Sequence, residues 1–204
     1  MVLGGGTIRK IFILILFSIS VITLTILSNK PNDLLILVNH ENPIDSNYNP
    51  KLGSFRTWYV AKELVEPLKE LEKDLEKLNI NFEIEKAYVS VKMQEKLFNT
   101  KVKEYQKQGL NEMDAKMETA KTILVPRYNE HHTGLSIDFK GDESLYNYLE
   151  HNAYKYGFIL RYPKGKEEIT KYEYDKKHYR HVGKENATKI YNQNLCLEEY
   201  LKED

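Results

Sequence analysis

Two short segments, about forty residues apart, hold four of the six histidines of this chain. The first reads N-E-H-H-T-G-L-S-I-D over residues 129–138, and the second reads H-Y-R-H-V-G over residues 178–183. Between them they offer two imidazoles and a carboxylate, the three-ligand set of catalytic zinc sites, which leave a fourth position open. A fold that uses these groups must bring both segments to one ion. The pattern therefore points to metal-assisted hydrolysis.

The first segment gains support from the residues that separate its histidines from its aspartate. A histidine seven residues before an aspartate is weak evidence alone, because such spacings often arise by chance. Thr133-Gly134, however, interrupts regular structure, so His131 can lie on a loop while Asp138 projects from the strand that follows. Spacing alone does not choose between His131 and His132.

The second segment places a condition on the local backbone. An extended chain over residues 172–182 would place Asp175 and His178 on opposite faces, because side chains alternate along a strand. Both can serve one site only if the chain turns near residues 176–177. Spacing does not choose His178 over His181 either.

Composition excludes some classes of function. The 204 residues include 30 basic and 30 acidic side chains, so the formal net charge is zero. Without a basic surplus, nucleic-acid binding gains no support, and we expect no nucleic-acid partner. The single cysteine, Cys196, cannot form an internal disulfide, which excludes a disulfide scaffold. The length predicts one domain with an appendage.

Residues 11–27 form an apolar run of seventeen residues, interrupted only by serine and threonine, directly after the basic pair Arg9-Lys10. This length is the short end of a membrane span and exceeds a usual signal-peptide core. We expect an uncleaved anchor, since neither an A-x-A site nor a lipobox cysteine is present; the alternatives are a cleaved signal segment and a buried core helix. The basic flank predicts a cytoplasmic segment at 1–10, a tether at 28–33 and an extracellular domain at 34–204.

Apolar periodicity and turn residues predict helices and strands in irregular alternation, without a βαβ period or an internal repeat. Residues 57–78 carry apolar side chains at spacings of three and four, an amphipathic helix pattern that Pro67 is expected to kink or divide. We expect a single compact α+β domain with a small antiparallel sheet flanked by helices, plus an N-terminal transmembrane helix. The other expected helices are 93–108, 112–121 and 144–156, and the expected strands are 34–38, 82–91, 137–139, 158–162 and 172–182.

Five segments of the chain carry motifs in a fixed order. They are L-V-N-x-x-N-P…Y-N-P-K-L at 37–52, A-Y-V-S…Q…L-F at 87–98, E-H-H-T-G-L-S-I-D at 130–138, N-A-x-x-Y-G-F-I-L-R-Y-P-x-G-K-E at 152–167 and H-Y-R-H-V-G at 178–183. In sequence and order they resemble the VanY-type D-alanyl-D-alanine carboxypeptidase family of zinc peptidases, which includes L,D-carboxypeptidases of cell-wall peptides. The matches extend over about residues 35–185, and five ordered matches are far more specific than any one of them.

The resemblance implies a ligand set and a cofactor. Carried over position by position, it makes His131, Asp138 and His178 the ligands of a Zn²⁺ ion. His132 and His181 fall where the family has other residues, so we interpret them as bystanders.

The resemblance also implies a substrate-binding region. Tyr88, Ser90 and Gln94 match residues that shape the substrate cleft, although these three can equally serve to organise a strand and the start of a helix. His40 and His151 have no role that the sequence suggests, and we expect them at the surface.

The first departure from the family pattern concerns the general acid/base. The family has a glutamate three residues before the last ligand, and this chain has Asp175 there. Aspartate carries the same group on a side chain one methylene shorter, and a base must come within about 2.6–3.2 Å of the proton it takes. Glu173 is the alternative base. A milder departure is Asn129, where the family has a serine.

The second departure is Val89, where the family has an arginine that clamps the substrate and the oxyanion. Valine cannot donate a hydrogen bond from its side chain, and losing one such donor typically costs about 100- to 1000-fold in turnover. Arg127, Lys92 and Arg161 are candidates to replace the arginine. For Arg161 the alternative is a surface ion pair with the glutamates at 167–168.

These features lead to two hypotheses about function. The first is a zinc-dependent carboxypeptidase, facing the cell wall from the membrane, that removes C-terminal D-alanine from peptidoglycan stem peptides with Asp175 as acid/base. The second is a non-catalytic domain that binds zinc and cell-wall peptide without turnover, as Val89 and Asp175 suggest. The oligomeric state is not determined by the sequence.

Overall fold

The computed structural model describes residues 33–203 of the 204-residue chain. The chain divides into two compact units, Met1–Ile36 and Leu37–Asp204. The described part of the first unit contains the short 3-10 helix η1 (Asp33–Leu35). The strand predicted over residues 34–38 is therefore wrong.

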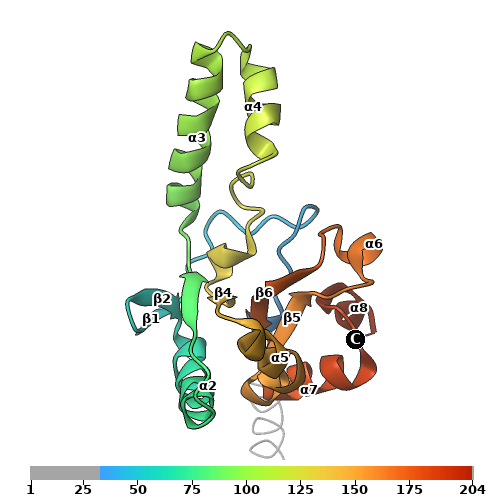
Figure 1. The fold of residues 1–204 in the computed structure, drawn as a ribbon. Coiled ribbons are helices and arrows are strands. Elements are labelled where there is room, and N and C mark those ends of the chain that lie inside the picture. The colour runs from blue at the N-terminus through green and yellow to red at the C-terminus, as the bar shows by residue number, and fades with distance from the viewer. Residues whose placement is uncertain (1–32, 204) are drawn as a thin grey trace, which may run out of the picture. The chain divides into compact units, whose positions relative to one another are not determined.

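The second unit contains two antiparallel sheets (Figure 1). The larger sheet has four strands in the order β3-β4-β6-β5, so its central pair, β4 and β6, comes from segments far apart in the sequence. The smaller sheet is a hairpin of β1 and β2. The strands are β1 (Leu52–Phe55), β2 (Trp58–Ala61), β3 (Glu83–Lys86), β4 (Ser136–Lys140), β5 (Phe158–Tyr162) and β6 (Asp175–His181).

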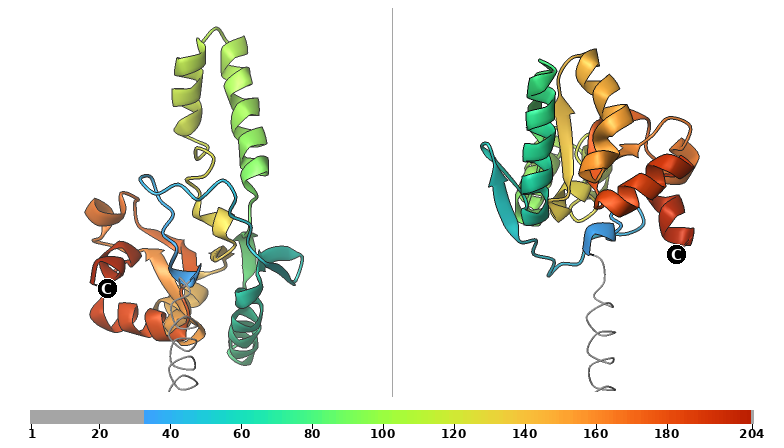
Figure 2. Two further views of the ribbon diagram at one scale, coloured as in Figure 1. Left: turned by 180° about the vertical axis from the view of Figure 1, so that it is seen from behind. Right: turned by 90° about the horizontal axis from the view of Figure 1, so that it is seen from below.

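Helices surround the larger sheet and connect its strands. The α-helices are α2 (Val65–Lys77), α3 (Val91–Lys107), α4 (Glu112–Ala120), α5 (Glu143–Asn152), α6 (Glu167–Thr170), α7 (Lys184–Gln193) and α8 (Leu197–Glu203). Three further 3-10 helices are η2 (Lys62–Leu64), η3 (Glu130–Thr133) and η4 (Ala153–Tyr156). Helices α3 and α4 pack against each other and extend side by side away from the sheet (Figure 2).

The predicted fold class needs correcting in two respects. The described residues of the second unit form a single compact α+β domain with two small antiparallel sheets, where the sequence predicted one. No helix among the described residues is long and apolar enough to cross a membrane: the longest, α3, has 17 residues and carries charges throughout. The span predicted at 11–27 and the cytoplasmic segment predicted at 1–10 lie outside the described residues.

The helix predicted over residues 57–78 begins later than expected. Its first residues pair with β1 as strand β2, and α2 starts only at Val65. Pro67 then falls in the first turn of α2, where the missing N–H would have had no partner within the helix, so no kink results. The apolar stripe of α2 is buried at Leu68, Leu71 and Leu75, which accounts for the periodicity.

Side chains along β4 and β6 alternate between the two faces of the sheet, so core residues and the predicted metal ligands lie on opposite faces. Phe139 of β4 and Tyr179 of β6 are buried and meet edge to face, with ring centroids 5.6 Å apart. Because successive side chains point to opposite faces, their neighbours Asp138 and His178 lie on the other face. These two residues are direct partners in the β4–β6 ladder, so the fold places them next to each other.

Candidate metal centre

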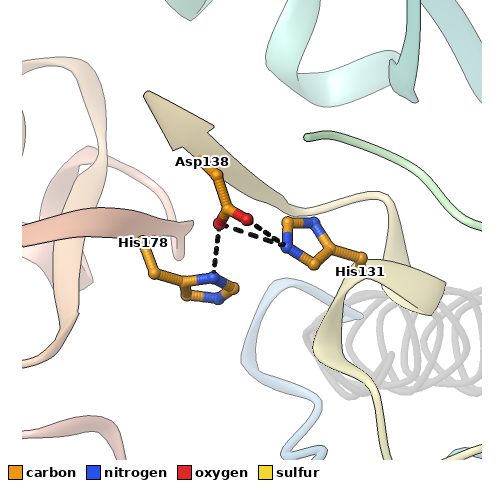
Figure 3. A group of neighbouring side chains, drawn as sticks. All are labelled: His131, Asp138 and His178. Carbon is orange, nitrogen blue, oxygen red and sulfur yellow. Dashed lines mark hydrogen bonds and ion pairs between the residues drawn. The ribbon is translucent and has the colours of Figure 1, made fainter. Parts of the chain in front are cut away.

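Three potential ligands from three elements converge on one point (Figure 3). His131 comes from η3, Asp138 from β4 and His178 from β6, and their ligand atoms all lie within 4.8 Å of one another. Nε2 of His131 is 3.2 Å from Oδ2 of Asp138, and Nδ1 of His178 is 2.7 Å from Oδ1 of Asp138. The structure thus brings together the three residues that the family resemblance selected.

The local sequence explains how His131 reaches the strand. Gly134 ends η3 with a left-handed backbone, φ 72°. A Cβ atom at this position would lie 2.9 Å from the backbone nitrogen of Ala61, so both the conformation and the contact require glycine. This tight turn places the four-residue helix of His131 directly before β4, which carries Asp138.

The backbone of β6 is irregular next to His178. Leu160 pairs with Tyr179, but Tyr162 pairs with Asp175, so two steps along β5 correspond to four along β6. The carboxylate of Asp175 accepts a hydrogen bond of 2.9 Å from the backbone N–H of Lys177, as in a local turn. This irregularity falls where the sequence required a turn for Asp175 to serve the same site as His178.

The two candidate bases differ in their surroundings. Asp175 is half-buried and belongs to β6, the strand of His178. Glu173 is exposed and precedes the strand. Neither belongs to the group of three convergent ligands. The assignment of Asp175 as acid/base stays a prediction.

A buried glutamate, Glu130, contacts the ring nitrogen of His178 that does not face Asp138. Its Oε2 lies 3.1 Å from Nε2 of His178 and accepts a 2.9 Å hydrogen bond from the hydroxyl of Ser136. Its Oε1 accepts hydrogen bonds of 2.8 Å from both Arg161 and Arg180. Burial raises the pKa of Glu130, but the two guanidinium charges and the bond to His178 outweigh it and hold that pKa well below its usual range.

Arg161 extends this network to the C-terminal helix. Its guanidinium donates two hydrogen bonds, of 2.9 and 2.7 Å, to the carboxylate of Glu198 in α8. Asn39 donates a third bond, of 3.2 Å, to the same carboxylate. Arg161 is fully buried, so the expected surface ion pair with the glutamates at 167–168 is wrong. Its two carboxylate partners also leave it no role as a substrate clamp.

Sequence reasoning assigned no role to Glu130 or Glu198. The position of Glu130 directly before the first ligand, inside the matched E-H-H-T-G segment, was a signal that could have found it. Glu198 carried no such signal, because it lies 37 residues from Arg161 and outside every motif.

The electrostatics of the three ligands suit a cation. Burial would lower the pKa of His178, but its bonds to Asp138 and Glu130 raise it to about 9. Burial would raise the pKa of Asp138, yet the two histidines hold it below its usual range. Positive charge at this point is therefore stabilised by the carboxylates of Asp138 and Glu130. Two imidazole nitrogens and a carboxylate are also the donor types that zinc binds, so the residues present fit the ion.

Different contacts fix the two ligand histidines. The bond from Nε2 of His178 to Glu130 directs the other nitrogen of the ring toward Asp138, the arrangement that supporting carboxylates give to metal-bound histidines. Nδ1 of His131 is buried and has no hydrogen-bond partner among the described residues. The backbone fixes His131 instead, since its N–H donates to Oδ1 of Asn129 at 3.1 Å.

The remaining histidines lie outside the group of three. Nε2 of His132 accepts a hydrogen bond from the backbone N–H of Arg127, so its Nδ1 carries the proton and donates to the carbonyl of Val89 at 2.6 Å. His181 is buried against the ring of Phe158, with centroids 5.0 Å apart. The remaining two, His40 and His151, are exposed, as predicted.

The predicted substrate-binding residues have protein partners of their own. The hydroxyl of Ser90 caps α3 by accepting a bond from the N–H of Met93. The buried amide of Gln94 donates to the carbonyl of Leu124 at 2.7 Å and accepts from Asn129 at 3.3 Å. Tyr88 is half-buried, and burial raises its pKa. These contacts fit the organising role weighed from the sequence, and substrate contact by the three residues stays a prediction.

Comparison with known proteins gives consistent matches. Residues 57–184 match the family model described as VanY, D-alanyl-D-alanine carboxypeptidase. The chain is 37% identical over 174 residues to a D-alanyl-D-alanine carboxypeptidase of Enterococcus faecalis (strain ATCC 700802 / V583), in an alignment that covers 82% of this chain and 65% of that protein. The chain thus spans slightly less than two thirds of that relative's length.

Solved structures agree in fold. A VanY D,D-pentapeptidase mutant from a VanB-type resistance cassette, in complex with Zn(II), matches with a TM-score of 0.69 and 35% identity over 83% of this chain and 99% of that one. The LdcB LD-carboxypeptidase, described in terms of peptidoglycan recognition, matches with a TM-score of 0.70 and 31% identity over 85% and 88%. The zinc complex of a relative and the convergent ligands here both agree with the zinc prediction. The chain therefore belongs to the VanY family of D-alanyl-D-alanine carboxypeptidases.

Proposed function

We propose that this protein is a zinc-dependent carboxypeptidase that removes C-terminal D-alanine from peptidoglycan stem peptides. The observation that carries the proposal is the convergence of His131, Asp138 and His178 within 4.8 Å, on elements that also place a buried carboxylate behind His178. The D-alanyl-D-alanine carboxypeptidase activity and the peptidoglycan recognition of the relatives support this choice of substrate. Such a substrate requires a domain on the cell-wall side, and that location stays a prediction.

The residues of the site would divide the work as follows. His131, Asp138 and His178 would hold the ion, and Glu130 keeps the His178 ring oriented by accepting a hydrogen bond from its Nε2–H. Zinc, when bound, supplies a Lewis acid that polarises the scissile carbonyl and lowers the pKa of water. Asp175 would accept a proton from the attacking water and return it to the leaving amine.

Asp175 is the better candidate for the acid/base. It shares β6 with His178 and is half-buried, whereas Glu173 is exposed and lies outside the strand. Substitution Asp175→Asn should therefore remove D-alanine release, and Glu173→Gln should leave it nearly unchanged. The reverse outcome would assign the role to Glu173.

The test of the proposal is release of free D-alanine by the purified full-length chain with zinc. Tetrapeptide and pentapeptide stems serve as substrates, and the His178→Ala variant, which should lose the metal, serves as the control. Release by the parent and none by the variant is expected. Zinc binding without any release from either stem would overturn the enzymatic proposal.

A second candidate function is peptide binding without turnover. Val89 favours it, since its side chain cannot clamp a substrate carboxylate, and so does the shortened acid at Asp175. This function predicts that the zinc-loaded chain binds stem peptides in calorimetry while no D-alanine appears.

A further inference from the structure

Lys86 is a half-buried lysine beside the metal centre whose ammonium has no hydrogen bond or ion pair with any described residue. It ends β3 and lies directly opposite Asp138 in the β3–β4 ladder. Neighbouring lysines are paired: Lys140 lies 3.2 Å from Glu83, which is also on β3. An ammonium that no carboxylate of the described residues neutralises can pair with an anionic group of a ligand.

An irregularity in the ladder directs Lys86 to the face of the ligands. Ile84 pairs with Phe139, both buried in the core, and the next pair is Lys86 with Asp138, so Glu85 is an extra residue in β3. Asp138 follows the core-facing side chain of its own strand and points to the opposite face. Directly opposed residues share a face, so Lys86 stands on the face of Asp138.

The extra residue also determines which charge meets the site. In a regular ladder Glu85 would oppose Asp138, which would place two carboxylates opposite each other. With the irregularity, the carboxylate of Glu85 instead accepts a 2.9 Å bond from Lys177. A lysine therefore takes the position opposite the ligand.

Val89, three residues after Lys86, stands where the family has an arginine, so a positive charge that binds the substrate must come from another residue. The backbone of Val89 donates to the carbonyl of His131 at 3.3 Å and accepts from His132, so this position flanks the same short helix, η3. Arg161 cannot supply the charge, because it is buried between two carboxylates. Among the described lysines, Lys86 is the one placed opposite a ligand.

We propose that Lys86 binds the terminal carboxylate of the peptide substrate, in place of the arginine that the family has at the position of Val89. This inference rests on the proposed function and deepens it. A lysine offers a point charge and lacks the planar fork with which arginine binds carboxylates in two parallel bonds. Recognition through Lys86 would therefore depend on charge more than on a fixed geometry.

The experiment compares two probes on the zinc-loaded full-length chain: D-alanyl-D-alanine, and its C-terminal amide, which lacks the carboxylate. Lys86→Met keeps the length of the side chain and removes its charge. Lys140→Met on β4 is the matched control, because its ammonium pairs with an exposed glutamate and lies two residues past Asp138. Dissociation constants come from calorimetry, zinc affinity from chelator competition, and KM and kcat from release of D-alanine.

Lys86→Met should weaken binding of the dipeptide about 10- to 100-fold, as expected for a hydrogen bond between charged groups, and should raise KM more than it lowers kcat. The amide should bind the parent and the variant equally. Zinc affinity should not fall, Lys86→Arg should restore dipeptide binding, and the control should match the parent.

Equal dipeptide binding by the parent and Lys86→Met would overturn the role of Lys86 and leave the proposed function standing. An equal loss for dipeptide and amide would also overturn it, because the charge of the carboxylate would then be irrelevant. A parent chain that neither binds nor cleaves the dipeptide would instead count against the proposed function, and the inference would fall with it.

Discussion

Nε2 of His178 lies 3.1 Å from Oε2 of the buried Glu130, at the ring nitrogen that does not face Asp138. This contact connects a potential metal ligand to a fully buried carboxylate, whose charge two arginines balance. Carboxylates in this position orient metal-bound histidines and increase their basicity.

Substitution Glu130→Gln should weaken zinc binding about 10- to 100-fold, because the amide no longer polarises the His178 ring. It should also destabilise the fold by about 3–5 kcal/mol, since Arg161 and Arg180 would lose a buried partner. Chelator competition and urea unfolding measure the two effects. Glu185→Gln, which changes an exposed glutamate of α7, is the control. Unchanged zinc affinity in a folded Glu130→Gln variant would contradict the role given to this residue.

Glu198 should contribute to stability from outside the region that matches the family. Glu198→Gln removes the charge that accepts two hydrogen bonds from Arg161 and should cost about 3–5 kcal/mol of unfolding free energy. Its effect on zinc affinity should be smaller than that of Glu130→Gln, because the hydrogen bonds of Glu198 go to Arg161 and Asn39 and none is to His178. Urea unfolding of Glu198→Gln beside Glu199→Gln, whose half-buried carboxylate pairs with Lys166 and accepts a bond from the backbone N–H of Cys196, measures the difference. Equal stability of the two variants would contradict this account of α8.

His181 should make the fold sensitive to acid. Burial, followed by the charge of Arg180, lowers its pKa from 6.5 to about 4. The unfolded chain therefore binds a proton more readily than the folded one, and stability is lost as the pH falls from about 6.5 to about 4. The loss from this residue amounts to about 3 kcal/mol. His181→Phe should flatten the unfolding free energy over this range, whereas His151→Phe, at an exposed site, should keep the slope of the parent. A parent-like slope in His181→Phe would contradict the assignment.

The two departures from the family pattern predict a gain of activity. Valine in place of a donor typically costs about 100- to 1000-fold in turnover, so Val89→Arg with Asp175→Glu should raise kcat substantially, up to that factor. The measurement is D-alanine release from stem peptides at saturating zinc, with each single variant beside the double variant. A double variant no faster than the parent would show that other residues already supply both functions.

Much of the site could be predicted from the sequence because its residues lie in short local motifs. His131, Gly134 and Asp138 belong to one segment, and the parity argument for residues 175–178 identified where β6 must be irregular. The family resemblance then selected among neighbouring histidines. Short motifs and their order along the chain can be recognised in a single sequence, so these site residues could be predicted.

The buried charge network could not be predicted, because burial depends on tertiary packing. The glutamates at 167–168 lie only six and seven residues after Arg161, yet its carboxylate partners are 31 and 37 residues away. The sequence also did not show that a strand and a helix compete for the same residues. Residues 58–61 fit a helical pattern, but pairing with β1 makes them a strand, and α2 begins at Val65.

The central claim is that one ion is bound by His131, Asp138 and His178, and X-ray absorption spectroscopy of the zinc-loaded full-length chain tests it most directly. The account predicts one zinc per chain, with a shell of two imidazole nitrogens plus oxygen ligands and no sulfur. It also predicts that His131→Ala and His178→Ala each lose this shell. A parent-like zinc spectrum and affinity in either variant would contradict the account.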